Sequence, residues 1–180
     1  MRSSRKTRRW RGWSSSSAGP RPLEAASVSG GTVGNLSALV AARQFARNQL
    51  GRHPVGQWRL ACTAQAHSSV QAAAAVLDAE VVIVPENDQG PVDRRSLTIS
   101  PHQPHDVLAV VASAGTTNAG IIDDLAGIAN VCQRFGVWLH VDGAYGGAAL
   151  AAPSARHLFN GDRARRQLHR RPTQVALRDL

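Results

Sequence analysis

The fold of this chain is decided by residues 136–147, which read GVWLHVDGAYGG. Within this stretch, five mostly apolar residues, Val137 to Val141, lie between two glycines. Such a run is too short for a buried helix, so it predicts a short buried strand that ends in a tight turn. Because ligands of open α/β sheets bind at the carboxyl ends of the strands, Asp142 is well placed to meet one. The alternative is that Asp142 only caps the segment that follows it.

The remaining sequence alternates between short apolar runs, which predict strands, and segments with apolar residues at helical spacing, which predict helices. The predicted strands are 58–62, 80–85 and 106–113, and the predicted helices are 29–51, 67–77 and 123–135. This alternation indicates an α/β layer fold with a mainly parallel sheet. Asp123 and Asp124 open the last helix, and we interpret them as helix-start residues rather than as a catalytic pair.

The positive charge of the chain, +9 over 180 residues, is confined to its two ends. Residues 1–22 carry seven basic residues and no acid, and residues 161–180 carry six arginines and two aspartates. The residues between them, 23–160, carry eight arginines and ten acids, a net charge of −2. This central part therefore gives no reason to expect a nucleic-acid partner. The basic start has three interpretations: a disordered segment, an organelle-targeting peptide or an RNA-binding arm.

Cysteine and histidine usage argues against redox and metal chemistry. Cys62 and Cys132 have no partner at metal-ligand or redox spacing, which predicts buried thiols in a reducing, cytoplasmic protein. His102 and His105 could bind a metal, but no third ligand accompanies them, and a surface loop is expected. No apolar run approaches the roughly 18 residues that span a bilayer, so no membrane partner is expected.

Three segments, in the right order, resemble the group II pyridoxal-phosphate-dependent amino-acid decarboxylases, which include the glutamate and aromatic-L-amino-acid enzymes. They are residues 29–43, SGGTVGNLSALVAAR, residues 107–124, VLAVVASAGTTNAGIIDD, and residues 138–147, WLHVDGAYGG. The resemblance covers residues 28–161 and implies an incomplete large domain of the fold-type I transferase-like class. It also implies a lyase activity that decarboxylates an amino acid, and a homodimer for the intact enzyme.

The first segment resembles the family's phosphate-binding segment, and the implied cofactor is pyridoxal 5'-phosphate (PLP). Glycines and free N–H groups at a helix start bind phosphate well, although a Gly-Gly turn alone is often only a turn. The resemblance assigns the cofactor phosphate to Gly31 and Thr32. Asn35 also occupies a characteristic family position, for which no defined role is implied.

The other motifs are implied to surround the cofactor ring. By resemblance, Asp142 accepts a hydrogen bond from the ring nitrogen, which favours the charged form of that nitrogen. His67 is implied to stack on one ring face and Ala144 to pack on the other, while Thr116 lies beside the cofactor. Two alternatives remain from the residues themselves: His67 as a helix cap, and the Gly-Thr-Thr segment around Thr116 as a plain strand-to-helix turn.

One family component is missing from the sequence. The family holds PLP through a Schiff-base lysine in an Asp-Pro-His-Lys segment, whereas the one lysine here is Lys6, before every motif. We therefore assign no catalytic residue and expect the chain alone to be inactive; a non-catalytic PLP-binding or partner-binding remnant is the alternative. The sequence divides into a basic segment 1–27, a partial PLP-binding domain 28–161 and an Arg-rich tail 162–180.

The residues of the Arg-rich tail are compatible with a family-like sequence in another reading frame. Codons permitted for Arg166 to Ala176 can be chosen so that reading one base later gives Asp-Ser-Phe-Ile-Val-Asp-Pro-His-Lys-Trp. Our hypothesis is that the chain leaves the family frame between Gly161 and Arg166, as a truncated product or through an error in sequence determination. Sequencing the coding DNA is expected to find codons that give this peptide, and any codon incompatible with it would contradict the hypothesis.

Overall fold

The structure is a computed structural model that describes residues 28–49, 51–85 and 106–159. These residues contain a four-stranded sheet in the order β2-β1-β3-β4, in which every pairing is parallel. Its strands are β1 Trp58–Thr63, β2 Ala79–Val84, β3 Val107–Ser113 and β4 Trp138–Asp142. The α/β fold with a parallel sheet, predicted from the sequence, is confirmed. Lys6, His102, His105 and the two basic ends lie outside the described residues.

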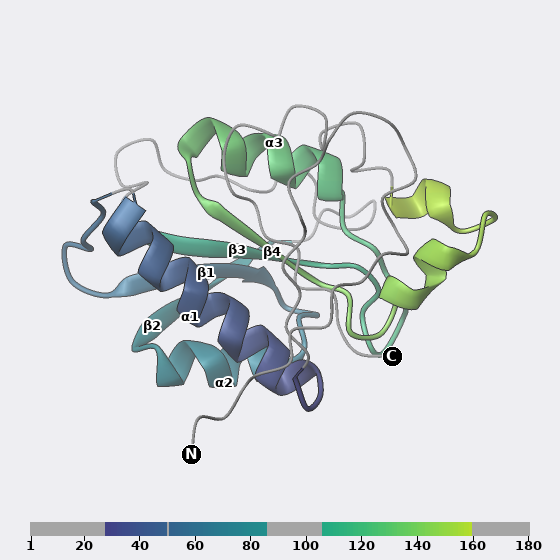
Figure 1. The fold of residues 1–180 in the computed structure, drawn as a ribbon, viewed down its shortest axis with the longest axis horizontal. Helices are drawn as coiled ribbons and strands as arrows, with labels where there is room; N and C mark the ends of the chain where they lie inside the picture. The colour runs from purple at the N-terminus through teal and green to yellow at the C-terminus, as the bar shows by residue number, and fades with distance from the viewer. Residues whose placement is uncertain (1–27, 50, 86–105, 160–180) are drawn as a thin grey trace, which may run out of the picture.

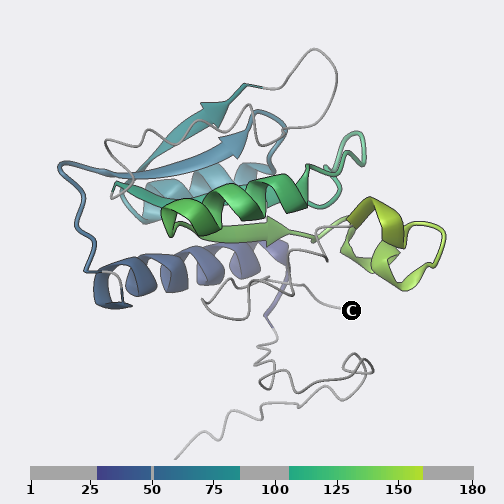
Figure 2. The ribbon, with the colours of Figure 1, turned by 90° about the horizontal axis from the view of Figure 1, so that it is seen from above.

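Helices cover both faces of the sheet (Figure 1). Helices α1 Gly31–Gln49 and α2 Ser68–Val76 lie on one face, and α3 Leu125–Phe135 lies on the other (Figure 2). Two short 3₁₀ helices, η1 Gly147–Ala151 and η2 Arg156–Phe159, follow β4. In the described part of the chain, no helix combines the length and the apolar character needed to cross a bilayer.

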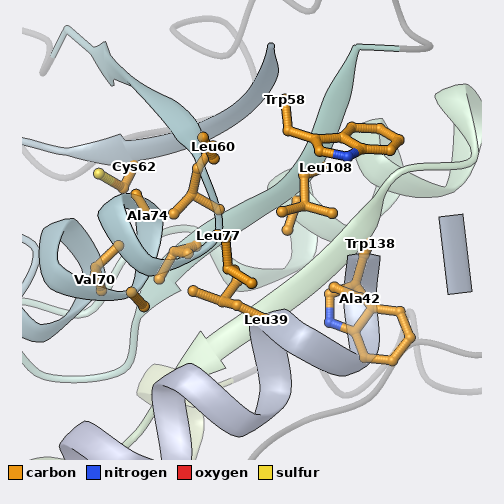
Figure 3. Close-up of a cluster of buried hydrophobic side chains, with 14 of the residues drawn as sticks. Leu39, Ala42, Trp58, Leu60, Cys62, Val70, Ala74, Leu77, Leu108 and Trp138 are labelled. Carbon is orange, nitrogen blue, oxygen red and sulfur yellow. The ribbon is translucent and has the colours of Figure 1, made fainter. Parts of the chain in front are cut away.

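The central strands β3 and β4 are apolar because both of their faces are covered. Every residue of these two strands is buried, as expected for parallel strands between helical layers. On the α1 and α2 face, Leu108 and Trp138 pack in a cluster with Leu39 (Figure 3). On the α3 face, Leu139 packs in a second cluster with Ile128. Val40 is one of the apolar residues at helical spacing in α1, but its side chain is 43% exposed, outside the stripe that faces the sheet.

The start of α3 separates the roles of its two aspartates. Asp124 is the N-cap, and its Oδ1 accepts a hydrogen bond from Gly127 N at 2.9 Å. Asp123 is buried instead, and its Oδ2 accepts from Ser113 N at 2.7 Å. The prediction of a helix-start residue is therefore confirmed for Asp124, whereas Asp123 fastens the carboxyl end of β3 to the segment that enters the helix.

Two glycines bring the loop after β3 against the turn after β4. A Cβ atom on Gly146 would lie 2.2 Å from the Ala114 carbonyl oxygen and 2.9 Å from Gly115 Cα. A Cβ atom on Gly115 would lie 2.7 Å from Gly146 Cα, and Gly115 also has a φ of +107°. Since the two backbones touch, only glycine permits this approach.

Replacing Gly146 by alanine isolates this contact, because its φ of −92° suits any residue. We expect Gly146→Ala to lower the free energy of unfolding by about 1–3 kcal/mol through overpacking. The matched control is Gly34→Ala in α1, whose Cβ would make an ordinary 3.5 Å contact with Val28. This control should be neutral or stabilising by up to about 1 kcal/mol. Denaturant unfolding followed by circular dichroism measures both; equal effects would contradict the proposed contact.

Candidate functional site

A cavity of about 300 Å³ lies where the carboxyl ends of β3 and β4 meet the N-termini of α1 and α2. This is the edge of a parallel sheet at which ligands are expected. The structure brings together at this cavity the residues that the sequence assigned to a cofactor, which are Gly31, Thr32, His67, Thr116, Asp142 and Ala144. They come from four separate segments of the chain.

Asp142 ends β4 at the wall of this cavity and is 9% exposed. Its Oδ1 accepts a hydrogen bond from Ala144 N at 3.0 Å, and its Oδ2 accepts one from Asn35 Nδ2 at 3.0 Å. A carboxylate offers about four acceptor sites, so Asp142 keeps capacity for a donor from the cavity. Asp142 thus caps the following turn, as the alternative interpretation held, and also lines the cavity.

Asn35, on α1, connects Asp142 to two further polar side chains. Its Nδ2 also donates to Ser69 Oγ at 2.9 Å, while its Oδ1 lies 2.8 Å from His140 Nε2. Because an ionised carboxylate only accepts, the amide nitrogen must face Asp142 and the amide oxygen must face His140. The His140 Nε2 therefore carries the proton that is donated to Asn35.

His140 is an uncharged member of this network. It is fully buried on β4, on the same strand face as Asp142 two residues later. Desolvation lowers the pKa of His140 to about 4, and the negative charge of Asp142 opposes that shift only in part. In the described part of the chain, its Nδ1 has no hydrogen-bond partner. His140 is therefore the neutral Nε2–H tautomer at neutral pH.

His67 is the N-cap of α2, so the capping interpretation holds together with its place at the cavity. Its Nδ1 accepts from Ser69 N at 3.2 Å and lies 2.8 Å from Ser69 Oγ. Because Asn35 already donates to that oxygen, the Ser69 hydroxyl proton is free to point at His67 Nδ1. These contacts fix the plane of the imidazole ring and leave the proton of the neutral ring on Nε2.

Two further parts of the cavity wall are the start of α1 and the loop after β3. Gly31 and Thr32 open α1, whose first-turn N–H groups lack intrahelical partners and favour an anion. A Cβ atom on Gly31 would lie 3.0 Å from Ala144 Cβ, so a larger residue would crowd the turn after β4. In the loop after β3, Thr116 is buried, and its Oγ1 accepts from Ile121 N at 3.1 Å. Its hydroxyl proton therefore remains available.

Half of the lining was not predicted as cofactor-binding from the sequence; these residues are Asn35, Ser69, Ser113, Gly115, Thr117 and Tyr145. Two signals could have pointed to the buried network. Asn35 follows Gly31 by four residues and so shares its helix face. His140 precedes Asp142 by two residues and so shares its strand face. The structure also shows no group of three or more potential metal ligands among its described residues.

Comparison with known proteins identifies the family to which this site belongs. Residues 12–165 match the pyridoxal-dependent decarboxylase conserved domain. The chain belongs to the pyridoxal-dependent decarboxylase family. The match begins upstream of Val28, where the resemblance in the sequence begins, and ends close to Gly161. The predicted membership in the group II amino-acid decarboxylases is confirmed.

Several relatives in this decarboxylase family are similar over most of the chain. Cysteine sulfinic acid decarboxylase of Rattus norvegicus is 35% identical over 143 residues, which are 73% of this chain and 29% of that protein. L-2,4-diaminobutyrate decarboxylase of Acinetobacter baumannii is 32% identical over 157 residues, 74% of this chain and 31% of that protein. A crystal structure of Oryza sativa TDC with PLP and tryptamine superposes with a TM-score of 0.63 at 27% identity, covering 73% of this chain and 30% of that one. The chain thus spans less than a third of the length of these relatives.

Proposed function

We propose that this chain forms the PLP-binding part of an amino-acid decarboxylase, a carboxy-lyase. The observation that carries the proposal is Asp142, a buried carboxylate at the end of β4 that two hydrogen bonds orient at the wall of a cavity. The cavity, about 300 Å³, is at the lower end of the range for small-molecule sites. The solved Oryza sativa relative holds PLP, which supports the same cofactor here.

The donor set of the cavity fits the two ends of PLP. The unpaired N–H groups at the start of α1, with Gly31 and the Thr32 hydroxyl, would hold the phosphate. The free acceptor capacity of Asp142 would hold a proton on the ring nitrogen, because a carboxylate favours the charged form of a group that donates to it. The negative end of the ligand is thereby directed to a helix N-terminus and its positive end to a carboxylate.

The remaining predicted contacts would fix the ring between two walls. His67, held by Ser69, would stack on one face, and Ala144 would pack on the other. Thr116 would donate its free hydroxyl proton beside the ring. When bound, PLP supplies an electron sink for cleavage of a bond at the α-carbon of an amino acid. The part of these residues is to set the tilt of the ring and to keep the proton at its nitrogen.

The lysine content of the chain bears on whether it can link PLP covalently and decarboxylate amino acids by itself. Its one lysine, Lys6, lies outside the described residues and before every motif. We therefore propose that the chain binds PLP without a covalent link and does not decarboxylate amino acids alone. The same observation favours a second candidate, a non-catalytic remnant that binds PLP or a partner. Coding DNA that gives the Asp-Pro-His-Lys segment in a shifted frame would favour the first candidate, and codons incompatible with that segment would favour the second.

The wider setting of the chain is part of the proposal. The PLP-binding domain comprises residues 28–161, and the basic segments 1–27 and 162–180 flank it. The intact enzyme is proposed to be a homodimer that acts on a small amino-acid substrate. A reducing, cytoplasmic location is supported by Cys62 and Cys132, which are buried free thiols. Burial raises the pKa of Cys62 to about 11 and that of Cys132 to about 12, which makes both poor nucleophiles.

Titration with PLP tests the proposed site. The chain is expected to bind PLP saturably, and Asp142→Asn should weaken binding by about ten- to a hundredfold, because a hydrogen bond to a charged group is lost. The matched control is Asp78→Asn, an exposed carboxylate that contacts Gln57 and does not line the cavity. Absorbance and tryptophan quenching report the dissociation constant, and carbon dioxide release from amino acids should be absent.

Lys6→Ala provides the second control of this titration. It should leave PLP affinity unchanged, because the proposed contacts involve no lysine. Loss of binding on Lys6→Ala, or equal affinity of the wild type and Asp142→Asn, would contradict the proposed site.

A further inference from the structure

We propose that Asn35 is a positioning residue, whose side-chain amide holds the Asp142 carboxylate in the rotation that receives the ring nitrogen of PLP. This inference rests on the proposed function and assigns a role to a residue that makes no proposed contact with the cofactor. It starts from the contacts of the Asn35 amide, which is 4% exposed and hydrogen-bonded to three side chains from other elements.

The orientation of the amide is fixed from both sides. Its nitrogen donates to Asp142 and Ser69, and its oxygen accepts from His140, so both protons and the oxygen are used. A flipped amide would place its oxygen against the carboxylate and its nitrogen against the Nε2–H of His140, which are two repulsive contacts. In a buried setting such repulsions are costly, because no water relieves them. Asn35 therefore has one orientation.

That single orientation determines how Asp142 can rotate. The two carboxylate oxygens have different partners, Ala144 N on Oδ1 and Asn35 Nδ2 on Oδ2. Two hydrogen bonds, one to each oxygen, fix the plane of the carboxylate, whereas one bond leaves it free to turn about its χ2 angle. Without Asn35, the carboxylate would keep only its bond to the turn. Its contact with a donor in the cavity would then be less well aligned.

His140 supports this role from β4, two residues before Asp142. His140 is fully buried, and its Nε2–H donates a hydrogen bond to Asn35 Oδ1. The Nε2–H of His140 thus excludes the flipped amide orientation. The same Nε2–H tautomer is consistent with an amide nitrogen that faces Asp142. The Asn35 side chain thus bridges two residues of β4, His140 and Asp142.

Ser69 offers a contrast within the same network. It accepts from Asn35 and contacts His67, so its loss would disturb the wall on which the ring is proposed to stack. Within the described residues, Ser69 makes no hydrogen bond to Asp142, whose two partners would remain. Replacing Asn35 should therefore change how strongly the ring nitrogen contributes to binding, whereas replacing Ser69 should not.

The test compares two ligands that differ at one atom. Dissociation constants are measured for PLP and for an analogue in which the ring nitrogen is replaced by carbon, so that no hydrogen bond to Asp142 can form. The wild type should prefer PLP. Asn35→Leu should reduce that preference about tenfold, as expected for a weakened hydrogen bond to a charged group. Ser69→Ala should weaken both ligands equally and leave the preference unchanged.

Controls separate positioning from stability and from the proposed function. Ser37→Ala, an exposed position on α1, should change neither affinity. Asn35→Ser, a smaller change, gives a second measure of the same preference, and thermal melting of the ligand-free variants reports their folding. In an Asp142→Asn background, Asn35→Leu should cause no further loss of preference, because coupled residues are not additive.

The outcomes are distinguishable. If the wild type binds PLP and the Asn35 variants keep its preference, the inference is overturned while the proposed function stands. If the wild type does not bind PLP, the proposed function fails and the inference fails with it. Equal weakening of both ligands by Asn35→Ser would assign Asn35 a purely structural role and would also overturn the inference.

Discussion

The hydrogen bond from Asn35 to Asp142 joins α1 and β4, the first helix and the last strand of the described residues. The two residues are 107 positions apart in the chain, and their side-chain atoms are 3.0 Å apart in the folded protein. Both groups are buried, so neither can exchange its partner for water without cost. The start of α1 is therefore held in a fixed position relative to the end of β4, and both line the cavity.

The parallel sheet makes this meeting possible. All four described strands run in the same direction, so the ends of β3 and β4 open at one edge, where α1 and α2 begin. The backbone contact between Gly115 and Gly146 holds the loop after β3, in which Gly115 lines the cavity, against the turn after β4. The site is thus built from the start of α1, the N-cap of α2 and the loops after β3 and β4. The packing of these helices and strands fixes the position of each part.

The sequence predicted much of this arrangement because its signals are local. The short run from Val137 to Val141, bounded by glycines, predicted β4, and Asp142 was expected at its carboxyl end. The buried network escaped prediction because it depends on pairing between distant segments. The spacings of Asn35 from Gly31 and of His140 from Asp142 place each pair on one face, but they do not show that the Asn35 amide contacts both Asp142 and His140. The exposure of Val40 likewise depends on how α1 rotates against the sheet, which periodicity defines only coarsely.

The most direct measurement of the central claim is the ¹⁵N NMR spectrum of the imidazole ring of His140, assigned with a His140→Gln variant. The orientation of Asn35 predicts a neutral ring protonated on Nε2 at neutral pH, and burial predicts that this form persists on acidification until the pKa of about 4 is approached. A ring protonated on Nδ1 alone, or a charged imidazolium at neutral pH, would contradict the account. Protonation on Nδ1 alone would mean that the Asn35 oxygen does not face His140 as described, whereas an imidazolium at neutral pH would mean that burial does not keep the ring neutral.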